Sequence, residues 1–193
     1  MDNSELLLEI NNWQLEIAKI DFNDKLIELA FFKIFVKFEK YMSKIFIHYS
    51  IGKKSSKKYK PKRKLGFSTE NQLNDMIRGS NRNYVDFSKT IALISFHIFQ
   101  EGNDPFSLIF SDPNFSDNYK KMQYIRNFIA HESEESRQKY INNVLNTYNI
   151  QNFIPVFEFL LRKNKKGDSY FSLYLDIIQS YSEILINPSP YLP

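Results

Sequence analysis

One long apolar segment most constrains how this 193-residue chain can fold. Residues 22–51 contain neither Gly nor Pro, and their helical periodicity predicts a helix about 45 Å long. Four lysines fall within about 60° of one another around the helix axis and form one solvent-facing stripe: Lys33, Lys37, Lys40 and Lys44. The rest of the surface is apolar over too wide an arc for a single packing partner; it comprises Phe31, Phe32, Phe35, Phe38, Met42, Ile45 and Phe46. Such a helix should be central, covered from two sides by its own chain or by a second subunit.

The composition favours helices throughout the chain. It contains 5 Gly, where average usage would give about 14. Strand-forming Val and Thr are scarce, and no Asn-Gly or Asp-Gly hairpin dipeptide occurs. We therefore predict an all-α fold, with helices at about 5–19, 22–51, 69–78, 87–100, 116–131, 134–148, 152–163 and 169–186. The length fits one domain, in which residues 1–150 form a helical bundle and the helices of 151–193 pack on it.

The absence of Cys excludes several classes of site at once. Disulfides, thiolate zinc sites, iron–sulfur clusters and a cysteine nucleophile all need residues that the chain lacks. No other spacing typical of metal ligands is present, so we expect neither a metal nor another cofactor. No apolar run approaches the ~18 residues of a membrane span, and the acidic start does not resemble a secretory signal. The expectation is a cytoplasmic protein without a membrane partner.

Positive charge is concentrated in one short segment. Residues 53–64 hold eight of the 26 basic residues and no acid, so the remaining chain carries a net charge of 4 − 8 = −4. Self-repulsion and a proline predict a mobile loop between helices. One interpretation is a solvated loop in a lysine-rich chain, and a nuclear-localisation signal fits the residues alone. The other is a phosphate-binding arm whose RNA-binding residues include Lys57, Lys58, Lys62 and Arg63.

Three ionisable side chains lie in or beside apolar helical surfaces. Glu39 falls within the apolar arc of the 22–51 helix, where a carboxylate is costly unless it is paired or reaches water at a packing edge. His48 lies near the lysine stripe and is predicted to be a surface histidine. His97 lies in a nearly all-apolar segment and is predicted to be a core histidine with a backbone partner.

Chemically useful side chains converge in the segment 116–131. Arg126 falls on the apolar side of this helix and needs an acceptor, for which Glu39 is the leading candidate. Asn127 and His131 are four residues apart, so they neighbour each other on one helical face. The amide could then hold one imidazole nitrogen and set the tautomer. We therefore select Arg126, Asn127 and His131 as candidate catalytic residues, with Glu39 in a supporting role.

The segment Arg126-Asn127-Phe128-Ile129-Ala130-His131 resembles the R-N-x-x-A-H form of the R-x4–6-H motif of HEPN (higher eukaryotes and prokaryotes nucleotide-binding) domains. The resemblance is local, although the all-α expectation extends it loosely over residues 1–150. It implies a helical bundle that dimerises with two motifs facing one cleft. It also implies metal-independent RNA cleavage in toxin–antitoxin or phage-defence systems, with an antitoxin or a nucleotidyltransferase-like protein as partner.

The chemistry of the motif agrees with this expectation. Arg126 and His131 lie about 140° apart on an ideal helix, so one copy does not form a compact site. Two copies across a two-fold axis would place two imidazoles and two guanidiniums around one phosphate. Imidazoles could move protons during attack by the 2′-OH, leaving a 2′,3′-cyclic phosphate. Two alternatives remain: a non-catalytic HEPN-like domain that binds RNA or a partner, and an unrelated helical interaction protein.

Overall fold

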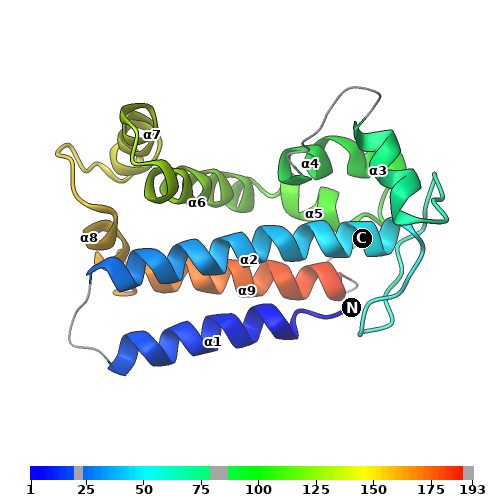
Figure 1. The fold of residues 1–193 in the computed structure, drawn as a ribbon, viewed down its shortest axis with the longest axis horizontal. Coiled ribbons are helices and arrows are strands. Elements are labelled where there is room, and N and C mark those ends of the chain that lie inside the picture. Colours follow the sequence, from blue (N-terminus) through cyan, green and yellow to red (C-terminus); the bar gives the residue numbers. More distant parts are fainter. Residues whose placement is uncertain (20–23, 79–86, 189–193) are drawn as a thin grey trace. The chain divides into compact units, whose positions relative to one another are not determined.

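The computed structural model describes residues 1–19, 24–78 and 87–188, and within these ranges the chain is all-α (Figure 1). The α-helices are α1 (Ser4–Lys19), α2 (Asp24–Ser50), α3 (Glu70–Arg78), α4 (Phe87–Ile98), α5 (Pro105–Ser111), α6 (Pro113–His131), α7 (Glu134–Tyr140), α8 (Val156–Leu161) and α9 (Tyr170–Ile186). The described residues form no β-strand, and their only β-type pairings are two isolated bridges. The predicted fold class is confirmed.

The helix boundaries differ from prediction in four places. Helix α8 spans Val156–Leu161, whereas a helix was predicted at about 152–163. Helix α5 was not predicted, although Asp104 caps it by accepting from the Phe106 backbone N–H and Pro105 occupies its first turn. Helix α6 begins at Pro113 rather than near residue 116. The single helix predicted at 134–148 is instead α7 followed by a π-helical turn (Ile141–Leu145) and a 3₁₀ turn (Asn146–Tyr148), which ends at Asn149 in a left-handed conformation.

The chain divides into two compact units, each built from segments that are not contiguous in the sequence. Unit 1 comprises residues 1–5, 38–112 and 180–193, and unit 2 comprises residues 6–37 and 113–179. Each unit therefore combines segments from before and after residue 150. Helices α2 and α9 contribute one half to each unit.

Unit 1 is built around the C-terminal half of α2. Phe46 packs edge-on against Phe99 and Phe106, with ring centroids 5.9 and 5.2 Å apart. The Tyr49 hydroxyl donates to the Leu185 carbonyl at 2.7 Å, which joins α2 to the end of α9. Burial raises the pKa of Tyr49 well above its usual value, so this hydroxyl stays protonated.

Unit 2 is built around the N-terminal half of α2. The Phe31 ring lies 5.9 Å from that of Tyr174 on α9, and the Phe35 ring lies 5.6 Å from that of Tyr119 on α6. Towards solvent, Lys37 Nζ pairs with Glu9 Oε2 of α1 at 3.2 Å. The other three lysines of the predicted stripe are exposed.

The wide apolar arc of α2 is buried within a single chain. Six of its seven members, Phe31, Phe35, Phe38, Met42, Ile45 and Phe46, are at most 1% exposed, and the seventh, Phe32, is half-buried. The prediction left open whether the rest of the chain or a second subunit covers this arc. The rest of the chain covers it, so burial of the arc does not require a second subunit. No helix among the described residues is long and apolar enough to cross a membrane.

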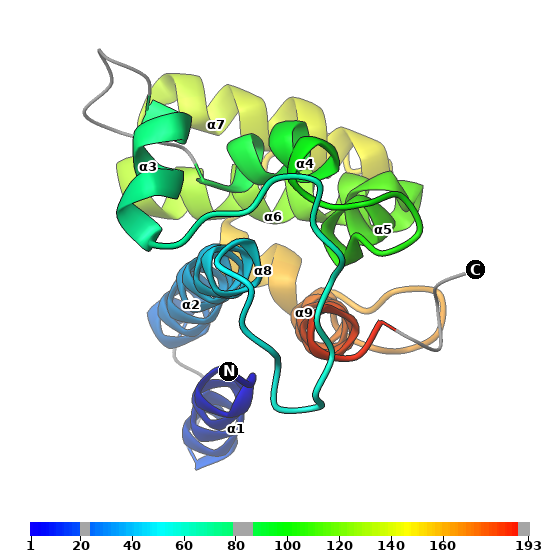
Figure 2. The ribbon, with the colours of Figure 1, turned by 90° about the vertical axis from the view of Figure 1, so that its right-hand side faces the viewer.

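The basic segment 53–64 is irregular, as predicted, but its backbone is tied to unit 1. Ser55 Oγ donates to the Ile186 carbonyl at 2.8 Å, and the Tyr59 hydroxyl donates to the Asn103 carbonyl at 2.8 Å. Pro61 is buried, and the Gln100 backbone N–H donates to the Lys62 carbonyl. Figure 2 shows the cyan trace of this segment passing the ends of α2 and α9 and returning to α4. These hydrogen bonds anchor the segment to the rest of unit 1, and we call it the tethered loop.

Two histidines take the opposite environments to those predicted. His97 is exposed at the end of α4, where its ring centroid lies 3.8 Å from that of Phe96. His48 is half-buried, and its Nε2 donates to the Lys54 carbonyl at 2.8 Å. The predictions failed because an apolar sequence neighbourhood does not say which helical face is covered, and the returning loop covers His48.

We predict that His48 makes stability depend on pH. Partial burial lowers its pKa, and the hydrogen bond to Lys54 offsets only part of that effect. As the pH falls below about 6.5, the unfolded chain binds a proton that the folded chain resists, so the free energy of unfolding should decrease. His48→Gln should flatten this decrease in urea titrations between pH 7.5 and 5, whereas His97→Gln at an exposed site should not. Coincident pH profiles for wild type and His48→Gln would contradict the burial of this imidazole.

Candidate functional site

The candidate motif occupies the C-terminal end of α6 in unit 2. The helix ends at His131, and the next residue, Glu132, has a left-handed conformation with φ 46°. The Glu132 backbone N–H still donates to the Phe128 carbonyl at 3.0 Å, and Ser133 then caps α7 by accepting from the Ser136 N–H. His131 therefore lies at a sharp corner between two helices, where its side chain is exposed.

Arg126 and Asn127 are half-buried one turn before His131. Arg126 Nη1 donates to Asn127 Oδ1 at 2.8 Å. The prediction paired the Asn127 amide with His131, but the hydrogen bond seen for Asn127 runs to the guanidinium. A charged donor makes a stronger hydrogen bond to an amide oxygen than a neutral imidazole does, which favours this choice. The amide thereby orients the arginine, and its effect on the histidine tautomer stays a prediction.

The exposure of the motif's side chains increases towards the C-terminal end of α6. Asn127 is half-buried, and both Ala130 and His131 are exposed. One copy can thus present an accessible imidazole and a positioned guanidinium.

Glu39 is half-buried on α2 in unit 1, where the Ser43 hydroxyl donates to its backbone carbonyl at 3.0 Å. It is neither a fully buried carboxylate nor a freely exposed one. Arg126 belongs to unit 2, so the predicted pairing between Glu39 and Arg126 stays a prediction.

The four candidate RNA-binding residues of the loop do not share one environment. Lys57, Lys58 and Lys62 are exposed, as phosphate-binding lysines must be. Arg63 is half-buried, and its Nη1 donates to the Ser50 carbonyl at 2.7 Å. A Cβ added to Gly52, whose φ is +82°, would lie 2.6 Å from Arg63 Nη2. Arg63 therefore closes the C-terminal end of α2, a structural role that the sequence pattern did not indicate.

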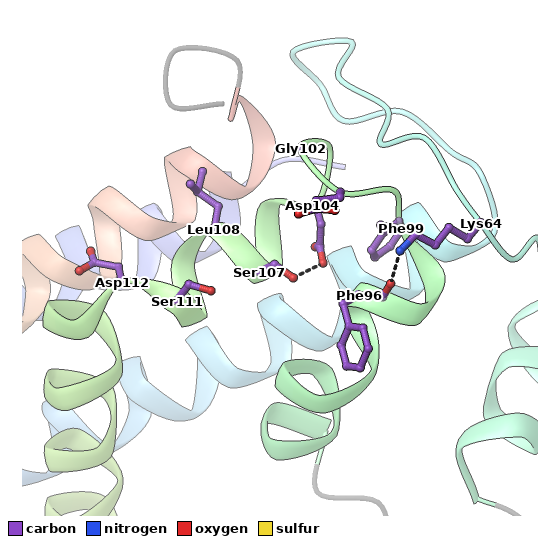
Figure 3. A pocket seen from close by; sticks show the side chains of 10 residues that line it. Lys64, Phe96, Phe99, Gly102, Asp104, Ser107, Leu108, Ser111 and Asp112 are labelled. Atoms are coloured by element: carbon purple, nitrogen blue, oxygen red, sulfur yellow. Dashed lines mark hydrogen bonds between the residues drawn. The ribbon is translucent and has the colours of Figure 1, made fainter. Parts of the chain in front are cut away.

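The cavities within the described parts of the two units include the following three. A shallow one of about 380 Å³ in unit 1 is lined by loop residues Lys60, Pro61, Lys62 and Arg63, together with Gly66 and Gln100. A larger one of about 680 Å³ in unit 1 is shown in Figure 3 and has apolar walls with three carboxylates, from Glu101, Asp104 and Asp112. Asp104 is engaged in capping α5, and Lys64 donates to the Phe96 carbonyl. The acidic lining makes this large cavity unsuited to phosphate.

The third cavity has a volume of about 330 Å³ and lies in unit 2 beside the candidate motif. Two of its lining residues, Phe128 and Ile129, are inside the motif itself. Sequence reasoning missed the others, because they reach the motif from three further helical segments and loops. The described residues hold no group of three or more His, Asp or Glu side chains placed to bind a metal ion.

Comparison of the chain with protein-family models, with curated proteins and with solved structures found no match.

Proposed function

We propose that this protein is a metal-independent endoribonuclease of the HEPN type. The observation that carries the proposal is the end of α6, where an exposed His131 follows one turn after an Arg126 guanidinium oriented by Asn127. An imidazole can donate or accept a proton near neutral pH. A guanidinium provides a fixed double donor for phosphate. These are the two tasks that RNA cleavage by a neighbouring hydroxyl requires.

The proposed reaction uses two copies of the motif. One imidazole accepts the proton of the ribose 2′-OH as the 2′ oxygen bonds to phosphorus. The bond between phosphorus and the 5′ oxygen then breaks, and the second histidine, in its imidazolium form, protonates that oxygen. The two guanidiniums stabilise the extra negative charge of the pentacoordinate transition state. The products are a 2′,3′-cyclic phosphate and a 5′-hydroxyl.

Purified wild type and His131→Ala should differ in cleavage of a defined RNA in the presence of EDTA. Loss of the proton-transfer group should lower the single-turnover rate by about 10²–10⁴-fold, and the wild-type products should carry 2′,3′-cyclic phosphate ends. His97→Ala is the matched control, because it removes an equally exposed histidine at the end of another helix. Arg126→Lys, which keeps the charge and loses the fork, should also be slow. If His131→Ala cleaves RNA as fast as the wild type, the activity belongs to another site or to a contaminant.

A homodimer is required by this reaction. The apolar arc of α2 is buried within one chain and therefore gives no support for a dimer. The support is that Arg126 and His131 of one copy form only half a site. We expect sedimentation of a dimer at micromolar concentration, joined through parts of α2 and α6. Ala130→Glu, at an exposed position beside His131, should dissociate it while the circular dichroism spectrum stays unchanged. A 23.0 kDa monomer for the wild type would contradict the two-copy mechanism.

The tethered basic loop is proposed to supply sequence-independent RNA affinity. Each lost phosphate contact should reduce the slope of log affinity against log salt by about 0.7 for single-stranded RNA. Replacing Lys57, Lys58 and Lys62 by Gln should therefore flatten the slope, while single-turnover cleavage at saturating RNA stays the same. The control replaces Lys33, Lys40 and Lys44, three exposed lysines of α2, with the same change in net charge. Equal flattening by both triple variants would mean that net charge, rather than the loop, attracts RNA.

The alternative is a non-catalytic HEPN-like domain that binds RNA or a protein partner. The specific observation that favours it is the anchored loop, whose exposed lysines can bind phosphate without any contribution from His131. An RNA-binding protein with a salt slope sensitive to the loop and no cleavage would support this alternative. An antitoxin or a nucleotidyltransferase-like protein would be the partner suggested by the HEPN resemblance.

A further inference from the structure

The cavity beside the candidate motif combines flat rings, a cation and carboxylates in one small space of unit 2. Its lining residues are Glu28, Phe128, Ile129, Glu132, Arg137, Phe153, Pro155 and Val156. A volume of about 330 Å³ is at the small end of ligand sites. Such a space suits one ring system rather than a length of chain.

The cavity adjoins the residues proposed to cleave RNA. Phe128 lies about 60° from His131 around an ideal helix, and Glu132 is the next residue in the chain. A group bound in the cavity would therefore lie on the side of α6 that carries His131, beside a phosphate bound at that histidine.

One wall offers a flat stacking surface. Phe153 is 39% exposed, and its ring meets that of Phe128 edge-on at a centroid distance of 6.2 Å. The Arg137 guanidinium carbon lies 4.4 Å from the centre of the Phe153 ring, so the planar cation covers part of that ring. Aromatic rings and arginine planes are the surfaces on which proteins stack unpaired RNA bases.

Glu132 has a conformation that a glutamate rarely adopts. Its φ is 46°, at the position after a helix end where glycine or asparagine is usual. Glu132 is exposed, and it is one of the residues that line the cavity. Unfavourable backbone conformations persist at positions where the side chain has a function.

We propose that this cavity binds a guanine base next to the scissile phosphate, an inference that rests on the proposed ribonuclease function. Guanine presents two adjacent donors, N1–H and the N2 amino group, and a carboxylate can accept from both at once. Adenine and cytosine place a ring acceptor beside their amino group, and uracil places carbonyl oxygens on both sides of its one N–H. Those acceptors would face the Glu132 carboxylate and repel it. Stacking on Phe153 and Arg137 holds the ring, and Glu132 selects it.

The first experiment measures binding without cleavage. His131→Ala protein is titrated into labelled oligouridine nonamers that carry one central guanosine, inosine or adenosine, and fluorescence anisotropy is recorded. Affinity should fall from guanosine to inosine, which lacks the N2 amino group, and again to adenosine. Adding Glu132→Gln should reduce the preference for guanosine over adenosine about 10-fold. Glu135→Gln is the matched control, because it removes the same charge from an exposed glutamate that does not line the cavity.

A second variant separates recognition from folding. Glu132→Gly removes the carboxylate and places glycine where the backbone has a left-handed conformation, so the melting temperature should rise. The guanosine preference should be lost in the same variant. A purely structural role for Glu132 predicts that stability falls or that the preference is kept, and either result would overturn the proposal.

The outcomes for the cavity and for catalysis are distinguishable. Guanosine preference that depends on Glu132, in a protein that cleaves no RNA, would keep the base site and reject the nuclease. Cleavage that depends on His131, with equal binding of the guanosine and adenosine nonamers, would keep the nuclease and overturn the base site. Phe153→Leu should weaken binding of all three nonamers, since stacking contributes to every base.

Discussion

Burial of the aromatic arc of α2 is the interaction on which both units depend. Each fully buried Phe contributes about 1.5–3 kcal/mol relative to an exposed one, and Phe31, Phe35, Phe38 and Phe46 are all at most 1% exposed. A surface ion pair such as Lys37–Glu9 contributes about 0–1 kcal/mol. The packing of other helices around α2 therefore orders the chain, and the lysine stripe only sets which side faces water.

The candidate site lies at the C-terminal end of α6, where the buried packing of that helix ends. Because Met122 and Ile125 are fully buried, α6 is held by its core-facing side, and its last turn can carry exposed side chains. The left-handed Glu132 stops the helix and directs the chain into α7. His131 and the small cavity both lie at this corner, which explains why the histidine that we propose as the proton-transfer group and a ring-sized space occur at the same end of α6.

The candidate site was only partly predictable from the sequence. Arg126, Asn127 and His131 were selected because the spacing of polar residues along one helix is a local property. The hydrogen bond from Arg126 to Asn127 depends on which acceptor the half-buried guanidinium can reach, and no spacing rule supplies that. Arg63 was grouped with exposed lysines, yet it binds the Ser50 carbonyl, because charge density does not reveal a partner 13 residues away. Phe153 and Arg137 carried no motif at all.

The sequence by itself determined the all-α class, the central position of α2 and its wet lysine stripe, since periodicity and residue preference act within a few residues. It also placed the C-terminal ends of α6 and α9 at residues 131 and 186, where the structure has them. Only the tertiary structure decided that α2 is covered by its own chain, that His48 is covered and His97 exposed, and that the basic loop is tethered. Those properties depend on contacts between residues far apart in the chain. Whether a side chain is buried depends on which distant segment packs against it, and the sequence of one segment does not contain that information.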